Sequence, residues 1–448
     1  MGKKLFWQDK IPFLKKSKEF FKKLNHRGIN LWPVMAGELY MFQETPIENK
    51  FEKFLMMIKF IFTMDKFNID YGKNRILVSC PIAREDHHNL VLKSIEKFPK
   101  KEIALLDNYY WKKKTSFLKY LFRLPDLVLL LNLWRQFKKY NMKKVFGKHY
   151  LFFLTRTYFR CKQIERLERI YNKLNPKAHI AFCSQTFVED TILTLFAKKN
   201  KKPTFTMEHG FVPNYPYFTS INIMTENMIS DYLLVWGKRN YDIEKKYISE
   251  NKLLIVGNPK YTYSDYNRKR NLDFNPKIAT FFLSVIGFEQ NNENVIKILS
   301  DFAVKHPEIQ FNLKLHPFDS PERYKSSIKS NNMIIVDKDM SVKDLLEKSD
   351  FVIIHNTSVV YEALFFRIPI FRFKDKFSQK VWGDFDTFKN KKEFENLFNN
   401  SKNNKFLDKN LKEYEKILTS SFYFERNKDP SQVYYEKISN IIKKSSTK

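Results

Sequence analysis

The chain has few cysteines and few glycines for its length. Only three of its 448 residues are cysteine and ten are glycine. Cys80, Cys161 and Cys183 are too few for a disulfide framework and lack the paired spacing of a metal site, so we expect buried thiols in a reducing compartment. The phosphate-binding signatures GxGxxG and GxxxxGK[ST] are both absent. These absences argue against a secreted disulfide protein, a standard dinucleotide enzyme and a P-loop ATPase.

Long uncharged hydrophobic runs are also missing. The stretches 54–64 and 124–134 are interrupted by Lys59 and Asp126, and neither approaches the roughly 18 apolar residues of a membrane-spanning helix. The first apolar residues are broken by lysines, and no small-residue cleavage site follows them, so we recognise no secretory signal. We therefore expect a cytoplasmic protein, peripheral on the inner face of the cell membrane.

Acidic residues are scarce beside basic ones, with 49 Asp and Glu against 80 Lys and Arg, a formal net charge of +31. This balance is typical of proteins that bind nucleic acid, anionic membranes or acidic substrates, and equally of chains with lysine spread over solvated faces. Basic residues alternate with large apolar ones near the N-terminus and again over 112–148, around Leu121, Phe122 and 127–131. The N-terminal apolar residues of this pattern are Phe6, Trp7, Phe13, Phe20, Phe21, Leu31 and Trp32. The mixture favours an anionic membrane surface as a partner.

Short apolar runs alternate with helical patterns along most of the chain, of which 43% is hydrophobic. The runs expected to form strands are 75–80, 101–106, 179–183, 204–207, 232–236, 253–256, 277–284, those starting at Phe311 and Phe351, 333–336 and 368–371. The alternation predicts an α/β protein with two Rossmann-like domains of parallel strands that face a cleft.

The composition divides this chain into five parts. They are a basic, aromatic-rich segment (1–73), a first Rossmann-like domain (74–262), a linker (263–276), a second Rossmann-like domain (277–410) and C-terminal helices that pack back (411–448). Before the linker, the tripeptide from Gly257 to Pro259 is expected to be a tight hinge turn and no catalytic element.

The stretch FNLKLHP, residues 311–317, reads as a buried strand that ends in polar residues. Lys314 and His316 carry groups that bind anions, and Pro317 stiffens the turn that presents the imidazole. A histidine there can donate to a phosphate oxygen or protonate a leaving group near neutral pH. A second HP dipeptide, at His306, is expected to be an ordinary helix-to-strand connection.

A second strand end, DFVIIHNTSVVYEA from Asp350, leads into an expected helix. His355, Asn356, Thr357 and Ser358 lie at this junction, where free backbone N–H groups and the helix dipole favour a phosphate. The hydroxyls either bind that phosphate or simply cap the helix. Glu362, one turn inside the helix, either reaches ribose hydroxyls or is a plain exposed carboxylate. Together the two strand ends predict a nucleotide crevice.

These motifs carry a family resemblance over roughly residues 178–375. KLHP followed by SDFVIIHNTSVVYEALFFRIPIF resembles the C-terminal domain of GT-B-fold glycosyltransferases. It is similar to bacterial surface-polysaccharide enzymes that use CMP-activated acidic sugars (sialic acid, Kdo) or CDP-glycerol. SQTFVED, TFTMEHG, DYLLVWG and VGNPKY resemble the acceptor-side domain of capsule and lipopolysaccharide transferases. The chain departs from the pattern at Glu208, where Gln is usual, and at Arg367, where Gly is frequent.

The resemblance implies a GT-B fold in which 277–410 binds the nucleotide-sugar donor and 74–262 receives the acceptor. The HP and Ser/Thr motifs would hold a cytidine nucleotide and its phosphate, with His316 contacting or protonating the leaving phosphate. It also implies metal independence, no cofactor besides the donor, and a bacterial surface glycan or glycolipid as acceptor.

A general base for the acceptor hydroxyl then has to come from the first domain. His209 is the first candidate, because it ends a strand and Gly210 lets the backbone turn close to a ligand. Glu208, Glu189 and Asp190 are alternatives, since a desolvated carboxylate is an adequate base. The run Asp86-His87-His88 is a further acceptor-side cluster; its two histidines lack a third ligand at metal-site spacing.

Three alternatives stay open. A CDP-glycerol-type glycerophosphotransferase shares the motifs. A UDP-sugar 2-epimerase of the same architecture would use Glu362 at the ribose and needs no acceptor. A nucleic-acid-binding protein is suggested by charge alone, and no binding motif supports it.

Overall fold

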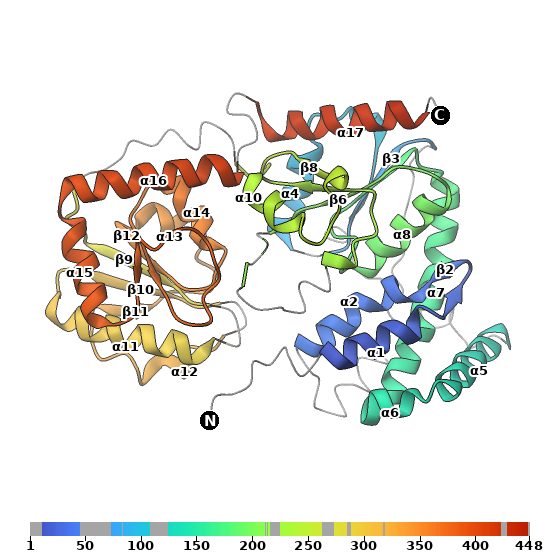
Figure 1. Ribbon diagram of the computed structural model, residues 1–448, viewed down its shortest axis with the longest axis horizontal. Helices are drawn as coiled ribbons and strands as arrows, with labels where there is room; N and C mark the ends of the chain where they lie inside the picture. The colour runs from blue at the N-terminus through green and yellow to red at the C-terminus, as the bar shows by residue number, and fades with distance from the viewer. Residues whose placement is uncertain are drawn as a thin grey trace.

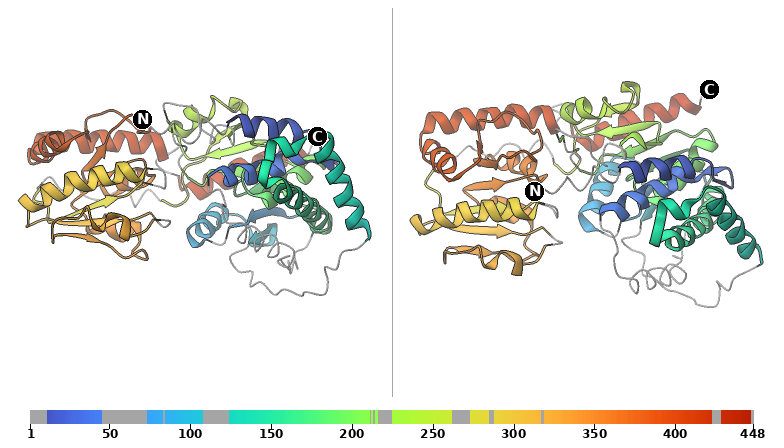
Figure 2. Two further views of the ribbon diagram at one scale, coloured as in Figure 1. Left: turned by 90° about the horizontal axis from the view of Figure 1, so that it is seen from below. Right: turned by 60° about the horizontal axis from the view of Figure 1, so that its bottom comes forward.

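Two α/β domains lie side by side in the computed structural model (Figure 1). The structure describes residues 11–44, 73–82, 84–107, 124–210, 212, 214–215, 225–261, 273–284, 288–316, 319–422 and 428–446. Each domain is built on a six-stranded parallel sheet, and the views in Figure 2 show the two domains following one another along the longest axis. The α/β class with two Rossmann-like domains, expected from the alternation of runs, is confirmed.

The first sheet has the strand order β4-β3-β5-β6-β7-β8. Its strands are β3 (Ile76–Cys80), β4 (Ile103–Asp107), β5 (Ala178–Ala181), β6 (Thr204–Met207), β7 (Tyr232–Val235) and β8 (Leu253–Ile255). Strands β3, β5 and β6 are buried along their whole length, as parallel strands covered on both faces must be. The order changes direction between β3 and β5, which makes the loops that follow them a natural ligand crevice.

The second sheet has the order β11-β10-β9-β12-β13-β14. Its strands are β9 (Ile278–Phe282), β10 (Gln310–Lys314), β11 (Met333–Ile335), β12 (Phe351–Ile354), β13 (Ile370–Phe373) and β14 (Thr387–Phe388). Every run expected to be a strand is one. The edge strand β14 was not expected, because two residues are too short to show a period. Here the order changes direction between β9 and β12.

Helices cover both sheets. In the first domain they are α4 (Glu85–Ile95), α5 (Leu124–Lys139), α6 (Met142–Phe146), α7 (Tyr150–Leu174), α8 (Val188–Lys199) and α10 (Lys238–Glu244). In the second they are α11 (Glu289–Lys305), α12 (Glu322–Lys325), α13 (Val342–Lys348), α14 (Val359–Phe366) and α15 (Lys391–Ser401). None of the helices in the described ranges has the length and apolar character to cross a membrane.

The N-terminal segment folds onto the first domain. Helix α1 (Ile11–Phe21) and helix α2 (Leu31–Glu44) flank a hairpin of β1 (Asn25–His26) and β2 (Ile29–Asn30) that was not expected. Its turn is Arg27-Gly28, where both residues have positive φ, the geometry of a tight two-residue hairpin.

The expectation that the N-terminal aromatic residues face a membrane is wrong for those that the structure describes. Phe20, Phe21 and Trp32 are buried in the core shared with α7 and α8, and Phe20 packs edge-on against Phe137 with ring centroids 4.9 Å apart. The interleaved lysines lie on the opposite, solvated face because an amphipathic helix separates the two sets. Phe6 and Trp7 lie outside the described residues.

Two C-terminal helices run from the second domain to the first (Figure 1). Helix α16 (Asn404–Phe422) packs on α14 and α15 and reaches α10, and α17 (Pro430–Ser446) packs on α4. At Gly237, just before α10, the end of α16 leaves no room for a side chain.

Substituting Gly237 tests this contact between the domains. A Cβ at this position would lie 2.0 Å from Ser421 O, so Gly237→Ala has to push α16 away from α10. We expect the free energy of unfolding to fall by about 1–3 kcal/mol, measured as a lower urea midpoint. Gly383→Ala is the matched control, since the nearest atom to its Cβ is 3.8 Å away, on Phe385. Equal midpoints for the two variants would contradict the prediction.

Candidate active site

A cavity of about 330 Å³ lies between the carboxyl ends of the two sheets. The first domain lines it with Arg84, Asp86, His87, Leu90, His209, Gly210, Trp236 and Asn258, the segment after β8 with Lys260 and Tyr261, and the second domain with His316, Ser358 and Glu362. Four residues singled out from the sequence, at three separate strand ends, therefore meet in one place: His209, His316, Ser358 and Glu362. Parallel α/β sheets bind ligands at this edge.

His316 is the part of the KLHP motif that reaches the cavity, two residues after β10 ends. Burial lowers the pKa of its imidazole; Asp319 opposes this effect and Arg84 adds to it. The ring is therefore neutral at neutral pH, with one nitrogen that donates and one that accepts a hydrogen bond. Pro317 lies outside the described residues.

Two more imidazoles face the cavity from the first domain. His87 on α4 and His209 after β6 each pack on the ring of Phe182 at 4.9 Å, and their own centroids are 6.2 Å apart. Burial lowers the pKa of both, and for His209, where the neighbouring His87 and Arg84 also contribute, to about 4. The first-domain side of the cavity thus presents two neutral imidazoles, each able to take up a proton.

The side chains of the run Asp86-His87-His88, on α4, point in different directions. His87 Nε2 stays in the cavity, 3.8 Å from Asp86 Oδ2. His88 points inward and pairs with Asp107 at the end of β4, where both side chains are buried. Of the two histidines, only the first lines the cavity.

The start of α14 lines the second-domain side of the cavity. Ser358 is exposed, occupies the N-cap position and makes no capping hydrogen bond with its hydroxyl, so the simple capping role considered for it is not observed. Glu362, one turn further, accepts hydrogen bonds from Tyr261 Oη at 2.8 Å and Lys260 Nζ at 3.2 Å. Sequence analysis placed these two residues at the end of the VGNPKY motif, just before the linker, and gave no sign of their contact with Glu362.

Asn356 and Thr357 line a different cavity, of about 350 Å³, on the other side of the α14 N-terminus. The Asn356 amide is already used, since its Nδ2 donates to Phe377 O at 3.0 Å and its Oδ1 accepts from Gln379 N at 2.9 Å. Thr357 Oγ1 accepts only a long bond of 3.4 Å from Val359 N. The three residues Asn356-Thr357-Ser358 therefore do not act as one unit.

Lys314 does not reach the cavity of His316, contrary to its expected role as an anion ligand. Its ammonium donates to two backbone carbonyls in the loop after β11, Asp337 O at 3.0 Å and Lys338 O at 2.6 Å. The side chain is largely buried, and this burial lowers its pKa. Lys314 fastens the loop that follows a neighbouring strand.

Glu208 is also a structural residue. Its carboxylate accepts hydrogen bonds from Trp236 N at 2.5 Å and from the Asn240 side chain, which ties the end of β6 to the start of α10. Burial raises its pKa well above the usual range of a glutamate. The side chain does not line the cavity, so the expectation that it competes with His209 as base is not supported by its position.

Asp190 lies beneath the first sheet, away from the cavity. On α8 it bonds the Ser79 hydroxyl and accepts from Cys183 N at 2.7 Å, and it is fully buried. Burial raises the pKa of Asp190 to about 8, against these two hydrogen bonds. Its neighbour Glu189 accepts from Gln163 on α7 at 2.6 Å. Neither carboxylate is placed to meet an acceptor.

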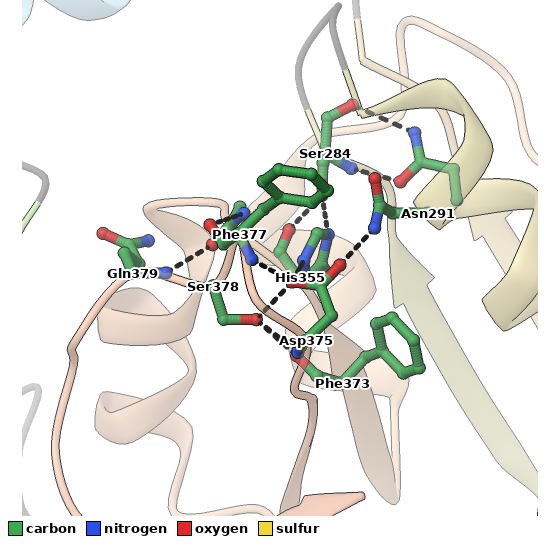
Figure 3. A network of polar contacts seen from close by, with 10 residues as sticks. Ser284, Asn291, His355, Phe373, Asp375, Phe377, Ser378 and Gln379 are labelled. Carbon is green, nitrogen blue, oxygen red and sulfur yellow. Dashed lines mark hydrogen bonds and ion pairs between the residues drawn. The ribbon is translucent and has the colours of Figure 1, made fainter. Parts of the chain in front are cut away.

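His355, the remaining polar residue at the end of β12, belongs to a buried network (Figure 3). Its Nδ1 lies 2.9 Å from Ser284 Oγ and its Nε2 3.4 Å from Asp375 Oδ1. The order Ser, His, Asp resembles a hydrolase triad, but Ser284 has no exposed surface and its hydroxyl is turned to the His355 carbonyl. Asp375 in turn accepts from Phe377 N at 2.8 Å. The network fixes the loop after β13.

That loop contacts the first domain beside the cavity. Lys380 N donates to Asn214 O at 2.7 Å, and Arg239 on α10 donates to Lys380 O at 3.4 Å. The Arg239 guanidinium lies 4.7 Å from the centroid of the Tyr361 ring on α14. Arg239 gave no signal in the sequence, since it is one basic residue of a helix in a chain rich in them.

Within the described part of the chain, no three His, Cys, Asp or Glu side chains gather closely enough to hold a metal ion. Two parallel-sheet α/β domains enclose one polar cavity between the carboxyl ends of their strands. The chain has the GT-B fold.

No protein-family model matches this sequence, and a search of curated proteins returned no match. Similar solved structures include a putative UDP-N-acetylglucosamine 2-epimerase from Listeria monocytogenes (10% identity, 83% of this chain and 97% of that one, TM-score 0.49). Others are the UDP co-structure of S. aureus MnaA (15%, 83% and 96%, TM-score 0.47) and a glycosyltransferase from Rickettsia africae (12%, 84% and 99%, TM-score 0.47). We base the fold on the two sheets themselves.

Asp190→Asn separates a structural carboxylate from a catalytic one. The pKa of Asp190 is about 8 in the folded protein, whereas that of an ordinary aspartate is 3.8. The unfolded chain therefore loses this proton first, and the wild-type protein becomes less stable as pH rises from about 4 to about 8. We expect the Asn variant to flatten that fall in urea unfolding. Its activity should stay near wild type, whereas loss of a catalytic base costs roughly 10²–10⁴-fold. A loss of that size would restore Asp190 as a candidate base.

Proposed function

We propose that the protein is a nucleotide-sugar-dependent glycosyltransferase acting on a bacterial surface glycan or glycolipid. The observation that carries the proposal is the single cavity in which neutral imidazoles of the first domain face His316 and the α14 N-terminus of the second. One side suits a hydroxyl that has to lose a proton, and the other suits a phosphate that has to leave.

The donor would lie against the second domain. The backbone N–H groups at the start of α14 and the Ser358 hydroxyl would hold a phosphate, and Glu362 would meet ribose hydroxyls. His316, neutral at physiological pH, would donate a hydrogen bond to the phosphate oxygen on which negative charge develops. These residues bind and orient the leaving group.

A CMP-linked acidic sugar is the donor we favour. Besides the resemblance of the motifs, this choice rests on Arg84, which lines the cavity and whose guanidinium is oriented by hydrogen bonds to Asp86 at 3.1 and 2.6 Å. Its position suits a sugar carboxylate held between the two domains, because a guanidinium matches that group in shape and charge.

The acceptor base would be His209, with His87 as its neighbour. As the bond from the anomeric carbon to the phosphate oxygen breaks and the bond to the acceptor oxygen forms, the acceptor proton would pass to the imidazole. A pKa of about 4 makes His209 a weak base in the free protein. A bound anionic donor would raise that pKa, since a nearby negative charge favours the imidazolium.

His316→Ala and His209→Gln test the assignment of sides. We expect either variant to lose roughly 10²–10⁴-fold in transfer rate, measured as sugar added to an acceptor by mass spectrometry. His306→Ala is the matched control, because it also precedes a proline but stacks on Phe302 at 4.1 Å and pairs with Glu308, outside the cavity. Full activity of His316→Ala would sink the proposal.

A thermal-shift panel of CMP, CDP, UDP and GDP identifies the nucleotide. A ligand at 100 times its Kd stabilises the folded state by about 2.7 kcal/mol, and we expect CMP to raise the melting temperature most. Turnover of UDP-GlcNAc without an acceptor would identify an epimerase instead. Addition of glycerol phosphate to the acceptor would identify a glycerophosphotransferase.

The pH dependence of transfer follows from the low pKa of His209. A base works only when it is unprotonated, so kcat/KM should fall with an acid limb near pH 4, the value for the free protein. The limb of kcat should lie at higher pH, because the bound donor raises the pKa. An acid limb of kcat/KM at or above the usual histidine value of about 6.5 would contradict a buried imidazole base.

A further inference from the structure

Helix α5, in the first domain, exposes an apolar stripe. Leu127 is 45% exposed, Val128 51%, Leu131 53% and Trp134 42%. These are four of the eight large hydrophobic side chains that are exposed in the described part of the chain, so the exposure is concentrated on this helix. Exposed apolar residues gathered in one place mark an interaction site, whereas scattered ones do not.

The spacing places the stripe on one face. Leu127, Leu131 and Trp134 follow one another at intervals of four and three residues, which brings them into line along a helix. Leu133 and Phe137 are buried in the core of the first domain and anchor the neighbouring face of the helix, about a quarter turn away. The helix is therefore fixed to the domain and presents its second apolar face outward.

Basic residues are concentrated on α5 and in α6 and the short turn that follow it. The segment 124–148 contains six basic residues, Arg135, Lys138, Lys139, Lys143, Lys144 and Lys148, against one acidic residue, Asp126. Asp126 is buried and paired with Lys162 at 2.8 Å, so it adds no negative charge to the surface. The Lys138 ammonium lies 5.3 Å from the centroid of the Trp134 ring.

We propose that this surface, the α5 stripe with the basic residues of 124–148, docks the protein on an anionic lipid bilayer. The apolar side chains would enter the headgroup boundary while the ammonium groups meet lipid phosphates. A nucleic acid or an acidic polysaccharide would satisfy the lysines and leave the leucines in water. A second copy of the chain would bring lysines against lysines across a two-fold contact, which costs energy.

The proposal does not depend on the reaction. Helix α5 lies at the end of the first domain that points away from the second domain, in Figure 1 and in both views of Figure 2. Docking variants therefore leave the cavity intact, and failure of the glycosyltransferase assignment would not remove the surface. The contrast with α1 supports the choice: Phe20 and Phe21 are buried and Phe13 is half-buried against the same core, so the lysines of α1 have no exposed aromatic partner.

Co-sedimentation of the full chain with vesicles tests the surface. We expect binding to vesicles of phosphatidylcholine with phosphatidylglycerol and much weaker binding to phosphatidylcholine alone. The triple variant Leu127→Ser, Leu131→Ser, Trp134→Ser should lose at least about tenfold in partition coefficient. The variant Lys143→Gln, Lys144→Gln, Lys148→Gln should lose on the order of 100-fold on the anionic vesicles, at roughly a factor of five for each lysine.

Matched controls come from the second domain. Val304 and Ile334 are also exposed apolar residues, at 62% and 42%, and their double change to Ser should leave binding unchanged. Circular dichroism should show the same melting temperature for the stripe variant, because its side chains are outside the core. Wild-type binding by the stripe variant overturns the proposal. So does a wild-type dimer in sedimentation velocity that becomes monomeric in that variant, which would assign the stripe to a second copy.

Discussion

The contact on which the candidate site depends is the one between Tyr261 and α14. The Tyr261 hydroxyl donates to Glu362 at 2.8 Å, and its ring stacks on Phe365 at 3.9 Å between centroids. Tyr261 belongs to the segment that leaves the first domain after β8, so this double contact holds that segment against the helix that starts at Ser358. Lys260 adds an ion pair to the same carboxylate. The position of the first-domain imidazoles opposite α14 follows from this attachment and from the packing of α16 against Gly237.

Three buried or half-buried carboxylates near the carboxyl edges of the two sheets have structural roles in this protein. Asp190, Glu208 and Asp375 each accept at least one backbone N–H, and each fastens a loop at the carboxyl edge of a sheet. The reason is general: loops at this edge carry N–H groups that no strand partner satisfies, and a buried donor without an acceptor is costly. The histidines of the site differ from these carboxylates in position. Three neutral imidazoles line the cavity, and none of the three carboxylates does.

Similar compositions serve different purposes in α1 and α5. Both helices mix lysine with large apolar residues, and their sequences alone suggest the same membrane role. In α1 the aromatic face packs against Phe137 and Phe146. Helix α5 packs on the core through Leu133 and Phe137, and a second apolar face remains exposed. An amphipathic pattern predicts that one face of a helix will be covered, but it does not predict whether the protein core or a membrane covers it.

The sequence by itself determined the class of the fold and nearly every strand, because buried parallel strands are short continuous apolar runs with clear polar ends. It also determined that His209, His316, Ser358 and Glu362 stand at or just beyond such ends. Tertiary structure decided which polar residues share one cavity. Lys314 and Asp190 bond backbone groups instead of lining the cavity. His87 and His88 are successive residues of one helix and point to different places, and Lys260 and Tyr261 join the site from the segment just before the linker. The position of each of these side chains depends on where other strands end in space, and no single sequence motif contains that information.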